Sequence, residues 1–181
     1  ELYIAYFNRA PDALGLNFWG TAFAKGVTLQ EISSLFLDQQ ETLITYPPGT
    51  TNVEFAASVY ANVFGRIPDQ SGLNFWVDML DRSNITGVSR GQFILEVLRG
   101  VQYGSADRDF LDKKIEIGSY FAVNKGMSNL EHARISMAIF DGSDESIYEA
   151  VDAIDAFYDN ALNYNTGEFL LQVVGLHDAQ F

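Results

Sequence analysis

The sequence contains no cysteine, only two histidines and four prolines, and no long run of apolar residues. The absence of cysteine excludes disulfide bonds, thiol catalysis and zinc sites with thiolate ligands. No stretch approaches the roughly 20 apolar residues that a membrane-spanning helix requires. Positive charge is scarce too, because 11 basic residues stand against 24 acidic ones and the net charge is −13. Since nucleic-acid binding needs clustered Lys and Arg, we expect no nucleic-acid partner.

Apolar residues, by contrast, are plentiful: 48% of the 181 residues are hydrophobic and 14% are aromatic. This apolar material suffices for a packed core, so the composition argues against disorder. The length fits one domain, or two small domains that share a core. The first residue is Glu1 and not Met. We therefore expect a processed product or an excised piece, with any targeting signal outside this sequence.

One string occurs twice, as RAPDALGLNFW at 9–19 and RIPDQSGLNFW at 66–76, a shift of 57 residues. After the tryptophan the register changes by four residues, and DRSNITG (81–87) is interpreted as a loop insertion. Two copies of one supersecondary unit explain this pattern most economically. The shared motif consists of Arg9, Pro11, Asp12, Gly15 and Trp19 in the first copy, and Arg66, Pro68, Asp69, Gly72 and Trp76 in the second.

Each copy is predicted to form a helix, a turn, a helix, a loop and a helix. The apolar spacing in the leading segments fits a helical stripe better than strand alternation. The Pro-Asp dipeptide opens a turn and supplies an N-cap for the second helix. The third helix of each copy begins with a capping-box pattern, Thr28-x-x-Glu31 and Ser89-x-x-Gln92. Matched caps support the repeat independently of the motif.

The motif has a structural and a functional interpretation. In the structural one, each arginine complements a helix C-terminus and reaches the aspartate three residues on, and each glycine allows close helix approach. Phe18, Trp19, Phe75 and Trp76 then supply apolar area to one core, with both tryptophans buried at equivalent positions. In the functional one, the Arg, Asp, Asn and Trp side chains line a sugar-binding groove. We favour the structural interpretation, because residues that specify a repeated fold must recur.

The rest of the chain is also predicted to be mainly helical. Helices are expected over 109–126, 128–140 and 143–162, the second starting with a Ser128-x-x-Glu131 capping box and the third capped by Ser143. The apolar, β-branched run at 168–176 could form a short strand. The expected fold is all-α with about seven to nine helices. Its parts are two repeats and a C-terminal helical extension packed on them, over the ranges 1–45, 53–104 and 107–181.

No catalytic constellation stands out. His132 and His177 have no partner at ligand spacing, and no particular pair of acids is singled out for glycoside hydrolysis. The acidic loop with Asp141, Asp144 and Glu145 is the weak calcium candidate, yet it lacks the EF-hand spacing. Other acids are placed on outward helix faces, which spreads the charge. We therefore expect no cofactor, and only weak, non-specific calcium binding.

The strings VYANVFGRIPDQSGLNFWVDML (59–80) and LYIAYFNRAPDALGLNFW (2–19) resemble the DUF4214 family. The resemblance covers residues 2 to 102, and the VFGR portion is also similar to phycobilisome linker domains. At Asn8 the first copy departs from the family pattern, which has Gly there, so this position is expected to turn or pack differently. The family's members are helical modules of bacterial secreted and cell-surface proteins, often beside calcium-binding RTX repeats or in surface-layer-like proteins exported by type I systems.

This resemblance implies an exported or surface-located bacterial protein and supplies no catalytic residue. The expected function is a non-catalytic module that binds a cell-envelope polysaccharide, a neighbouring surface protein or copies of itself. The alternative is a secreted hydrolase that acts on glycans through a carboxylate pair. A cleft with two carboxyl groups about 5–10 Å apart, flanked by exposed aromatic side chains, favours the enzyme, and we expect none.

Overall fold

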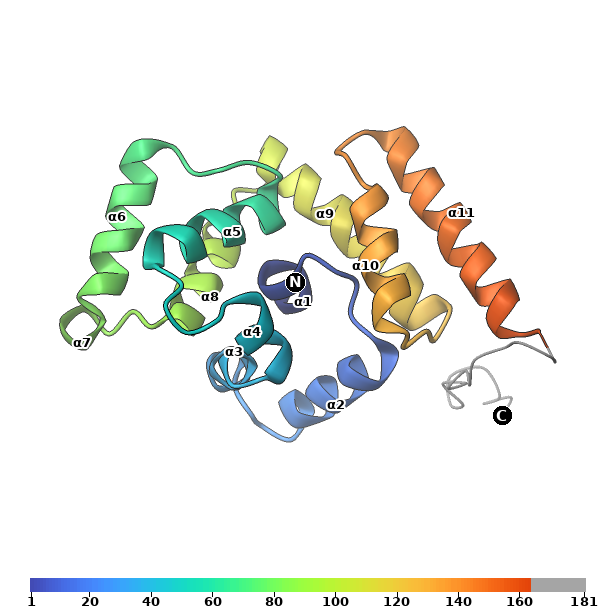
Figure 1. Cartoon of the computed structure of the whole chain (residues 1–181), viewed down its shortest axis with the longest axis horizontal. Helices are drawn as coiled ribbons and strands as arrows, with labels where there is room; N and C mark the ends of the chain where they lie inside the picture. Colours follow the sequence, from blue (N-terminus) through green and yellow to red (C-terminus); the bar gives the residue numbers. More distant parts are fainter. Residues whose placement is uncertain (164–181) are drawn as a thin grey trace.

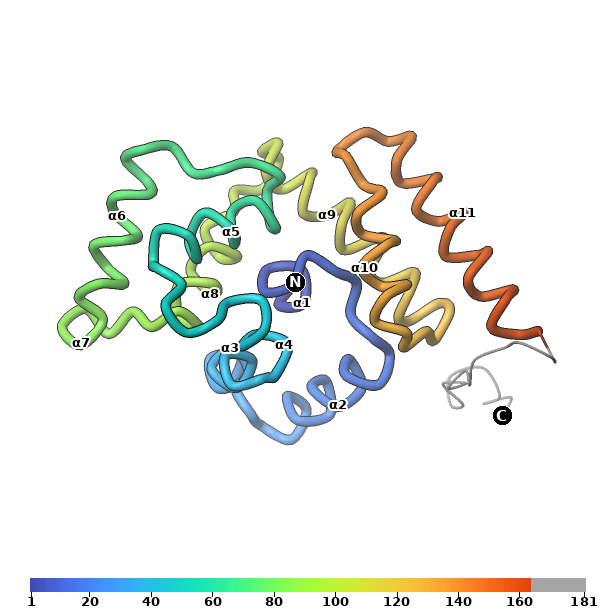
Figure 2. Tube along the Cα trace, viewed as in Figure 1, coloured from blue at the N-terminus to red at the C-terminus, as the bar shows by residue number. Residues whose placement is uncertain are grey.

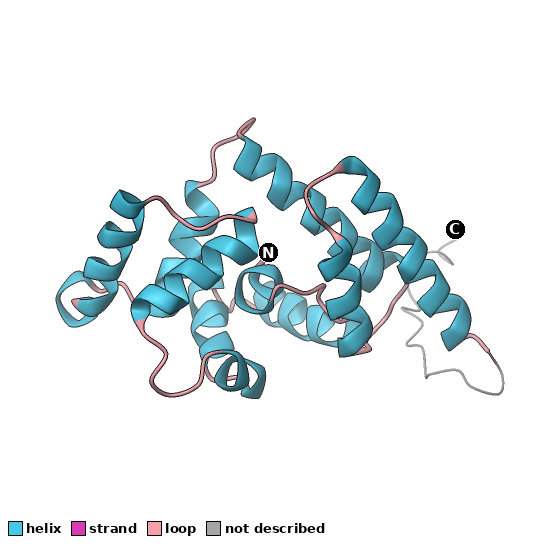
Figure 3. Cartoon of the chain, turned by 45° about the horizontal axis from the view of Figure 1, so that its top comes forward, coloured by secondary structure: helices cyan, strands magenta, loops and turns pink. Residues whose placement is uncertain are grey.

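The computed structural model of the chain describes residues 1–163, which form eleven α-helices and one π-helical turn joined by loops (Figures 1 and 3). No strand occurs among these residues, so the all-α prediction is confirmed for them, with more helices than expected. The strand proposed for 168–176 and His177 lie outside the described residues. The elements are α1 (Leu2–Phe7), α2 (Ala13–Ala24), α3 (Leu29–Leu37), α4 (Gln40–Thr45), α5 (Asn52–Phe64), α6 (Gln70–Asp81), α7 (Ser83–Thr86), α8 (Arg90–Gly100), α9 (Ala106–Ser119), η1 (Tyr120–Asn124), α10 (Leu130–Ile139) and α11 (Asp144–Ala161).

The two copies of the motif have the same local structure. Asp12 and Asp69 are the N-caps of α2 and α6, and each side chain accepts a hydrogen bond of 2.7 Å from the third amide of its helix. Thr28 forms a complete capping box at α3. Ser89 caps α8 without the reciprocal bond of a capping box, because the Gln92 side-chain oxygen accepts from the Gln30 amide and not from the Ser89 backbone. The predicted order of helices is therefore found in both copies.

The connections differ from the expectations at two places. The insertion at 81–87 is not a plain loop, because it contains the short helix α7. The N-cap of α10 is Asn129 and not Ser128, since the Asn129 side chain accepts from two backbone amides. Ser128 instead accepts a hydrogen bond from the backbone of Leu14. Asn needs only its own short side chain to cap a helix, whereas the expected box depended on Glu131.

Within residues 1–163, three more α-helices follow the two copies. A first helix, α9 with η1, leads to α10 with an Asx cap, and α11 follows with the predicted cap Ser143. The first helices lie together in the middle of the molecule, where α5 packs on both α1 and α9 (Figure 2). Packing of α3 on α8 joins the two copies, and α10 packs on α11. The core is thus one continuous cluster.

Lys114 in α9 connects the ends of α1 and α5 by hydrogen bonds. Its side chain is buried, and its ammonium group donates to the Asn8 side-chain oxygen and, at 2.6 Å, to the Asn62 carbonyl. Asn8 adopts the left-handed conformation, with φ 50°, as Gly65 does in the second copy with φ 65°. The departure at Asn8 therefore keeps the turn and changes the packing. Asn is among the residues that tolerate this conformation best.

Candidate functional site

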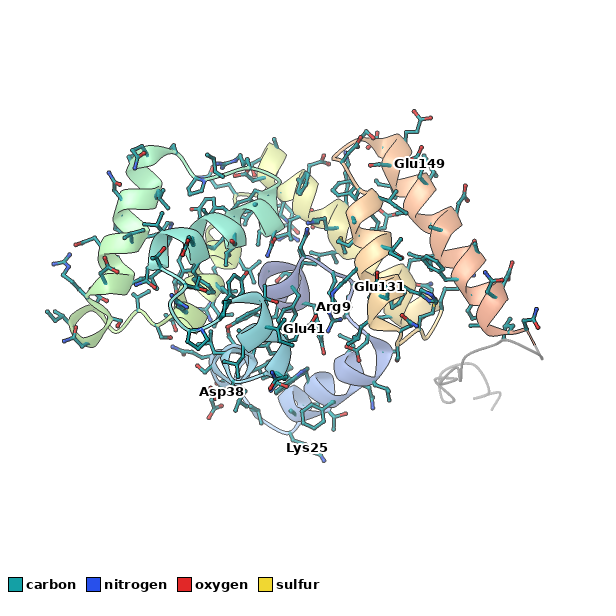
Figure 4. The ribbon with its side chains drawn as sticks, in the orientation of Figure 1. Arg9, Lys25, Asp38, Glu41, Glu131 and Glu149 are labelled. Carbon is teal, nitrogen blue, oxygen red and sulfur yellow. The ribbon has the colours of Figure 1, made fainter. Side chains whose placement is uncertain are left out.

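The arginine of the first motif copy has a structural role. Arg9 is buried and donates to both carboxylate oxygens of Glu41 in α4, at 2.8 and 2.7 Å, and more weakly to Asp12 at 3.4 Å (Figure 4). In the second copy, Arg66 makes the same two-bond contact with Asp107 in α9, at 2.9 and 2.5 Å. The main partners are thus acids in a following helix, and not the aspartate three residues on.

The prolines and glycines of the motif also serve packing and helix capping. Pro68 is buried, and Pro11 lies against α9 so closely that a Cβ on Gly118 would stand 3.0 Å from its ring. A Cβ on Gly15 would lie 2.1 Å from the Tyr3 hydroxyl, which confirms the close approach expected there. Gly72 has no such neighbour, because its nearest contact is its own cap, 3.5 Å away.

The two tryptophans lie at corresponding places, each half-buried against the core. The ring of Trp19 lies 5.1 Å from Phe36, and that of Trp76 lies 5.0 Å from Phe93. The Trp76 indole also donates to the Tyr60 hydroxyl at 3.0 Å. Full burial was therefore the wrong expectation. Each indole is only partly buried, and α2 and α6 lie at the periphery of the molecule (Figure 1).

The phenylalanines that precede these tryptophans point outward. Phe18 is 63% exposed and Phe75 is 56% exposed, so the expectation that they supply the core is wrong. Each ring stands edge-on to its neighbouring tryptophan, at 4.9 and 5.0 Å between centroids. The asparagine before each phenylalanine, Asn17 or Asn74, is exposed as well. The repeated NFW string therefore places an amide and a phenyl ring on the surface twice.

These outward pairs were absent from the sequence-based site residues, although a signal existed. A tryptophan and the phenylalanine before it are about 100° apart on a helix, so only one of the two can face a core directly. Repetition of the whole string argued for a shared role of both residues. In the structure the two residues differ: the tryptophan packs on the core, and most of the phenylalanine ring is exposed to solvent. We define the two NF pairs, 17–18 and 74–75, as the candidate site.

An acidic hollow lies between α9 and α11. Its lining residues are Asp109, Asp112, Lys113, Glu116, Asp144, Ile147 and Tyr148. Lys113 binds two of the carboxylates, Asp109 at 2.9 Å and Asp144 at 2.7 Å, and Arg108 binds Asp112 at 2.5 Å. Carboxyl groups beside the exposed Tyr148 ring resemble the hydrolase cleft that the sequence analysis did not expect. Three of these four acids, however, are paired with the Lys113 or Arg108 side chain.

The calcium candidates do not converge. Asp141 accepts two hydrogen bonds from Ser143, and these bonds lower the pKa of the Asp141 carboxyl. Asp144 is engaged by Lys113, and Glu145 is exposed on α11. Among residues 1–163, no group of three or more acids and histidines is arranged to hold a metal ion. The chemistry of this loop is explained by helix capping and ion pairing.

His132 and the acids of α11 have defined surroundings in the structure. His132 stacks flat on Phe157, with 4.0 Å between ring centroids, and its Nδ1 atom is buried without a hydrogen-bond partner. Among the acids placed on the outward face of α11, Glu149 is exposed (Figure 4). Asp155 is partly exposed, and it accepts from the Tyr120 hydroxyl and pairs with Lys125, both at 2.8 Å.

The comparisons with known proteins identify one part of the chain. Residues 33–99 match the family described as "Domain of unknown function (DUF4214)". The matched segment starts inside α3 and ends in α8, so it includes the second motif copy. No curated protein and no solved structure matched the chain. Within the described residues, no helix is both long and apolar enough to cross a bilayer. The chain therefore contains a DUF4214 domain at residues 33–99.

Proposed function

We propose that this chain is a non-catalytic binding module of a secreted or cell-surface bacterial protein. Its ligand is a neutral polysaccharide of the cell envelope, and the NF pairs on α2 and α6 are its two contact points. The observation that carries the proposal is the exposure of Phe18 and Phe75 at corresponding positions.

Packing within the chain explains some of the repeated residues but not the exposed phenylalanines. In a repeated unit, residues that specify the fold recur because both copies must fold. Arg9 and Arg66 recur for that reason, and so do the tryptophans. An exposed phenylalanine contributes little to folding, because most of its ring stays in water. Its recurrence together with an exposed asparagine therefore supports a role in contacting something else.

The chemistry of the pair favours a neutral sugar polymer. The phenyl ring offers an apolar face, and the amide both donates and accepts hydrogen bonds. Sugar rings present the complementary combination of an apolar face and hydroxyl groups. The net charge of −13 repels acidic polymers at long range. Two pairs on separate helices also suit a polymer, because a second contact on the same strand binds at a high effective concentration.

The electrostatics support a module without catalysis. A glycosidase general acid needs a raised pKa. The described carboxyl groups with a shifted pKa all have it lowered, chiefly by hydrogen bonds: Glu31, Glu41, Glu54, Asp69, Asp141 and Asp155. In the acidic hollow, Asp109 and Asp144 pair with Lys113, and Asp112 pairs with Arg108. A location at the cell surface agrees with the cysteine-free, acidic composition and with the DUF4214 domain.

Binding of the full chain to insoluble neutral polysaccharides and to purified cell envelopes tests the proposal. Retention is compared between the wild type, Phe18→Ala, Phe75→Ala and the double variant. We expect each single change to weaken retention and the double change to abolish it. Tyr148→Ala is the matched control, because Tyr148 is another exposed aromatic residue, 71% exposed, outside the repeat. It should bind like the wild type.

Three results contradict the proposal. Retention that survives the double variant would place the binding elsewhere. Retention on cell envelopes that disappears after protease treatment of the envelopes would identify a surface protein as the partner. Release of reducing sugar that continues at a constant rate and scales with the amount of chain would show catalysis.

A further inference from the structure

The two NF pairs differ in the residue that lies one helical turn before the asparagine. In the second copy this residue is Gln70, whose side-chain amide donates a hydrogen bond of 2.8 Å to the Asn74 side-chain oxygen. In the first copy the same place is taken by Ala13, which is buried and has no polar side chain. Within residues 1–163, no hydrogen bond of the Asn17 side chain is found. The repeat therefore contains one amide that is oriented by a neighbour and one that is not.

The hydrogen bond between Gln70 and Asn74 determines which of their amide groups remain available. Because the Asn74 oxygen accepts from Gln70, the N–H groups of Asn74 remain as donors. The Gln70 oxygen remains as an acceptor, since it is the Gln70 nitrogen that makes the bond. Side chains four residues apart on a helix are neighbours, so this donor and this acceptor lie side by side. Both residues are exposed, and Phe75 follows directly. We call Gln70 and Asn74 the amide pair.

Other polar side chains one turn away from Phe75 already have partners. Before the ring, the Ser71 hydroxyl donates to the Asp69 carboxylate at 2.6 Å. After the ring, Asp78 is paired with Arg82. These groups serve the cap of α6 and an ion pair on its surface. The amide pair therefore supplies a neutral donor and a neutral acceptor together beside this ring.

We propose that Gln70, Asn74 and Phe75 bind sugars that carry an acetamido group in preference to unsubstituted sugars. An acetamido group has one N–H donor, one carbonyl acceptor and a methyl group. Its carbonyl accepts from Asn74, its N–H donates to Gln70, and its methyl group packs on the Phe75 ring. A hydroxyl group at the same carbon makes hydrogen bonds but has no apolar part to place on the ring. This inference rests on the proposed function and names the class of sugar at its second contact point.

The first NF pair has a different character. One turn before Phe18 lies Leu14, which is 55% exposed, where the second copy has the polar Ser71. The α2 pair thus offers apolar area without an oriented amide. It adds affinity for either kind of sugar, whereas the α6 pair determines the preference between them.

The charge of the chain agrees with an acetamido sugar. The acetamido group is neutral, so the net charge of −13 does not oppose its approach. Sugars with carboxylate groups are repelled at long range. Free amino sugars are cationic, and they are attracted to the acidic surface as a whole without any need for the amide pair.

Two soluble tetrasaccharides with the same linkage test the preference. The chitin type consists of N-acetylglucosamine and the cellulose type of glucose, so the two differ only in the acetamido groups. Titration calorimetry of the full chain should show at least about fivefold tighter binding of the chitin type, as one net hydrogen bond provides. Gln70→Ala should reduce this preference to less than about twofold, because the Asn74 amide loses its orientation. Gln70→Glu should do the same, since a carboxylate accepts from Asn74 and turns the Asn74 oxygen outward.

Gln102→Ala is the matched control, because Gln102 is another exposed glutamine and lies outside both repeated strings. This variant should keep the full preference. Asn17→Ala should weaken the binding of both tetrasaccharides by the same factor. The midpoint of urea denaturation should be the same for Gln70→Ala and the wild type, whereas a purely structural role of Gln70 would lower it.

The outcomes separate this inference from the proposed function. Equal affinities for the two tetrasaccharides, or a preference that survives Gln70→Ala, overturn the inference, while loss of binding in Phe75→Ala would still support the function. Binding of neither tetrasaccharide, or binding that does not depend on Phe75, contradicts the proposed function and the inference together.

Discussion

The guanidinium group of Arg9 and the carboxylate of Glu41 meet through two parallel hydrogen bonds of 2.8 and 2.7 Å. The same contact recurs between Arg66 and Asp107. Both acids lie in the first turn of the helix that follows the third helix of their copy. Each copy of the repeated string is therefore completed by an acid outside it, Glu41 for the first and Asp107 for the second. The two pairs differ in exposure, because the Arg9 side chain is 3% exposed and the Arg66 side chain is 49% exposed.

This difference predicts unequal costs for removing the two arginines. Arg9→Ala leaves an acid near the core with only the exposed Arg134 beside it, and should cost about 3 kcal/mol of unfolding free energy. Arg66→Ala breaks an exposed pair and should cost under about 1 kcal/mol. Urea denaturation of the full chain, followed by circular dichroism, measures both. Equal costs would mean that the difference in burial between Arg9 and Arg66 does not affect the free energy of unfolding.

The stability of the chain in acid should depend on Glu41. Burial disfavours its charged form, but hydrogen bonds and charge from Arg9, with help from Arg134, outweigh this and lower the pKa of Glu41 from its ordinary 4.5. Its contribution is thus fully present above pH 4.5 and is lost as the pH falls through the lowered value. Glu41→Gln should be less stable than the wild type at pH 7, and the gap should narrow between pH 5 and 3. An unchanged gap contradicts this role.

Lys114 predicts a further rise of stability with pH, in mild alkali. Burial lowers the pKa of its ammonium group from 10.5 to about 8. Between these values the unfolded chain holds a proton that the folded chain has released, so stability should rise as the pH rises. We expect an increase from pH 8 to 9.5, below the range in which tyrosines titrate. Lys114→Met should abolish the increase in urea denaturation, and a rise that persists in this variant would assign it to another group.

The NFW strings predict different effects on stability for adjacent residues. Trp19→Ala and Trp76→Ala each remove a half-buried indole and should cost about 2–3 kcal/mol, less than a fully buried tryptophan. Phe18→Ala and Phe75→Ala remove exposed rings and should change stability by less than about 0.5 kcal/mol. Chemical denaturation of the four variants measures this. If the phenylalanine variants prove as unstable as the tryptophan variants, the outward rings are structural after all.

Helix content was predictable from the sequence because it depends on local signals. The caps at Asp12, Asp69, Thr28 and Ser143 lie within three residues of the amides that they bind, and all four formed as predicted. Asn129 was missed because the adjacent Ser128 matched a longer pattern. The three helices expected after the repeats also formed, because their apolar spacing is a local signal too.

Contacts between distant residues were not predictable in this way. Nothing near Arg9 in the sequence indicates Glu41, and Lys114 meets Asn8 across more than a hundred residues. The orientation of Phe18 was also inaccessible, because adjacent apolar residues on a helix compete for one core and periodicity does not tell which prevails. The candidate site therefore depended on the three-dimensional packing of α2 and α6.

Calcium should have little effect on the melting temperature of this chain. Asp141 and Asp144 have partners within the protein. Among residues 1–163, no three acids or histidines lie close enough together to hold a metal ion. A site with a dissociation constant near 10 μM would add about 2.7 kcal/mol at 1 mM calcium. We expect a much smaller, diffuse effect that magnesium reproduces. A shift of that full size, lost in Asp141→Ala, would reveal a site in this loop.

The most direct test of the central claim is the affinity of Phe75→Ala for a retained neutral polysaccharide, measured by titration calorimetry beside the wild type. Phe75 is chosen because its ring is exposed on α6, at the periphery of the molecule (Figure 1). The account predicts that affinity falls at least about tenfold, equivalent to 1.4 kcal/mol, while the free energy of unfolding stays unchanged. Unchanged affinity in this variant, with Tyr148→Ala indistinguishable from it, would show that the repeated phenylalanines do not bind the ligand.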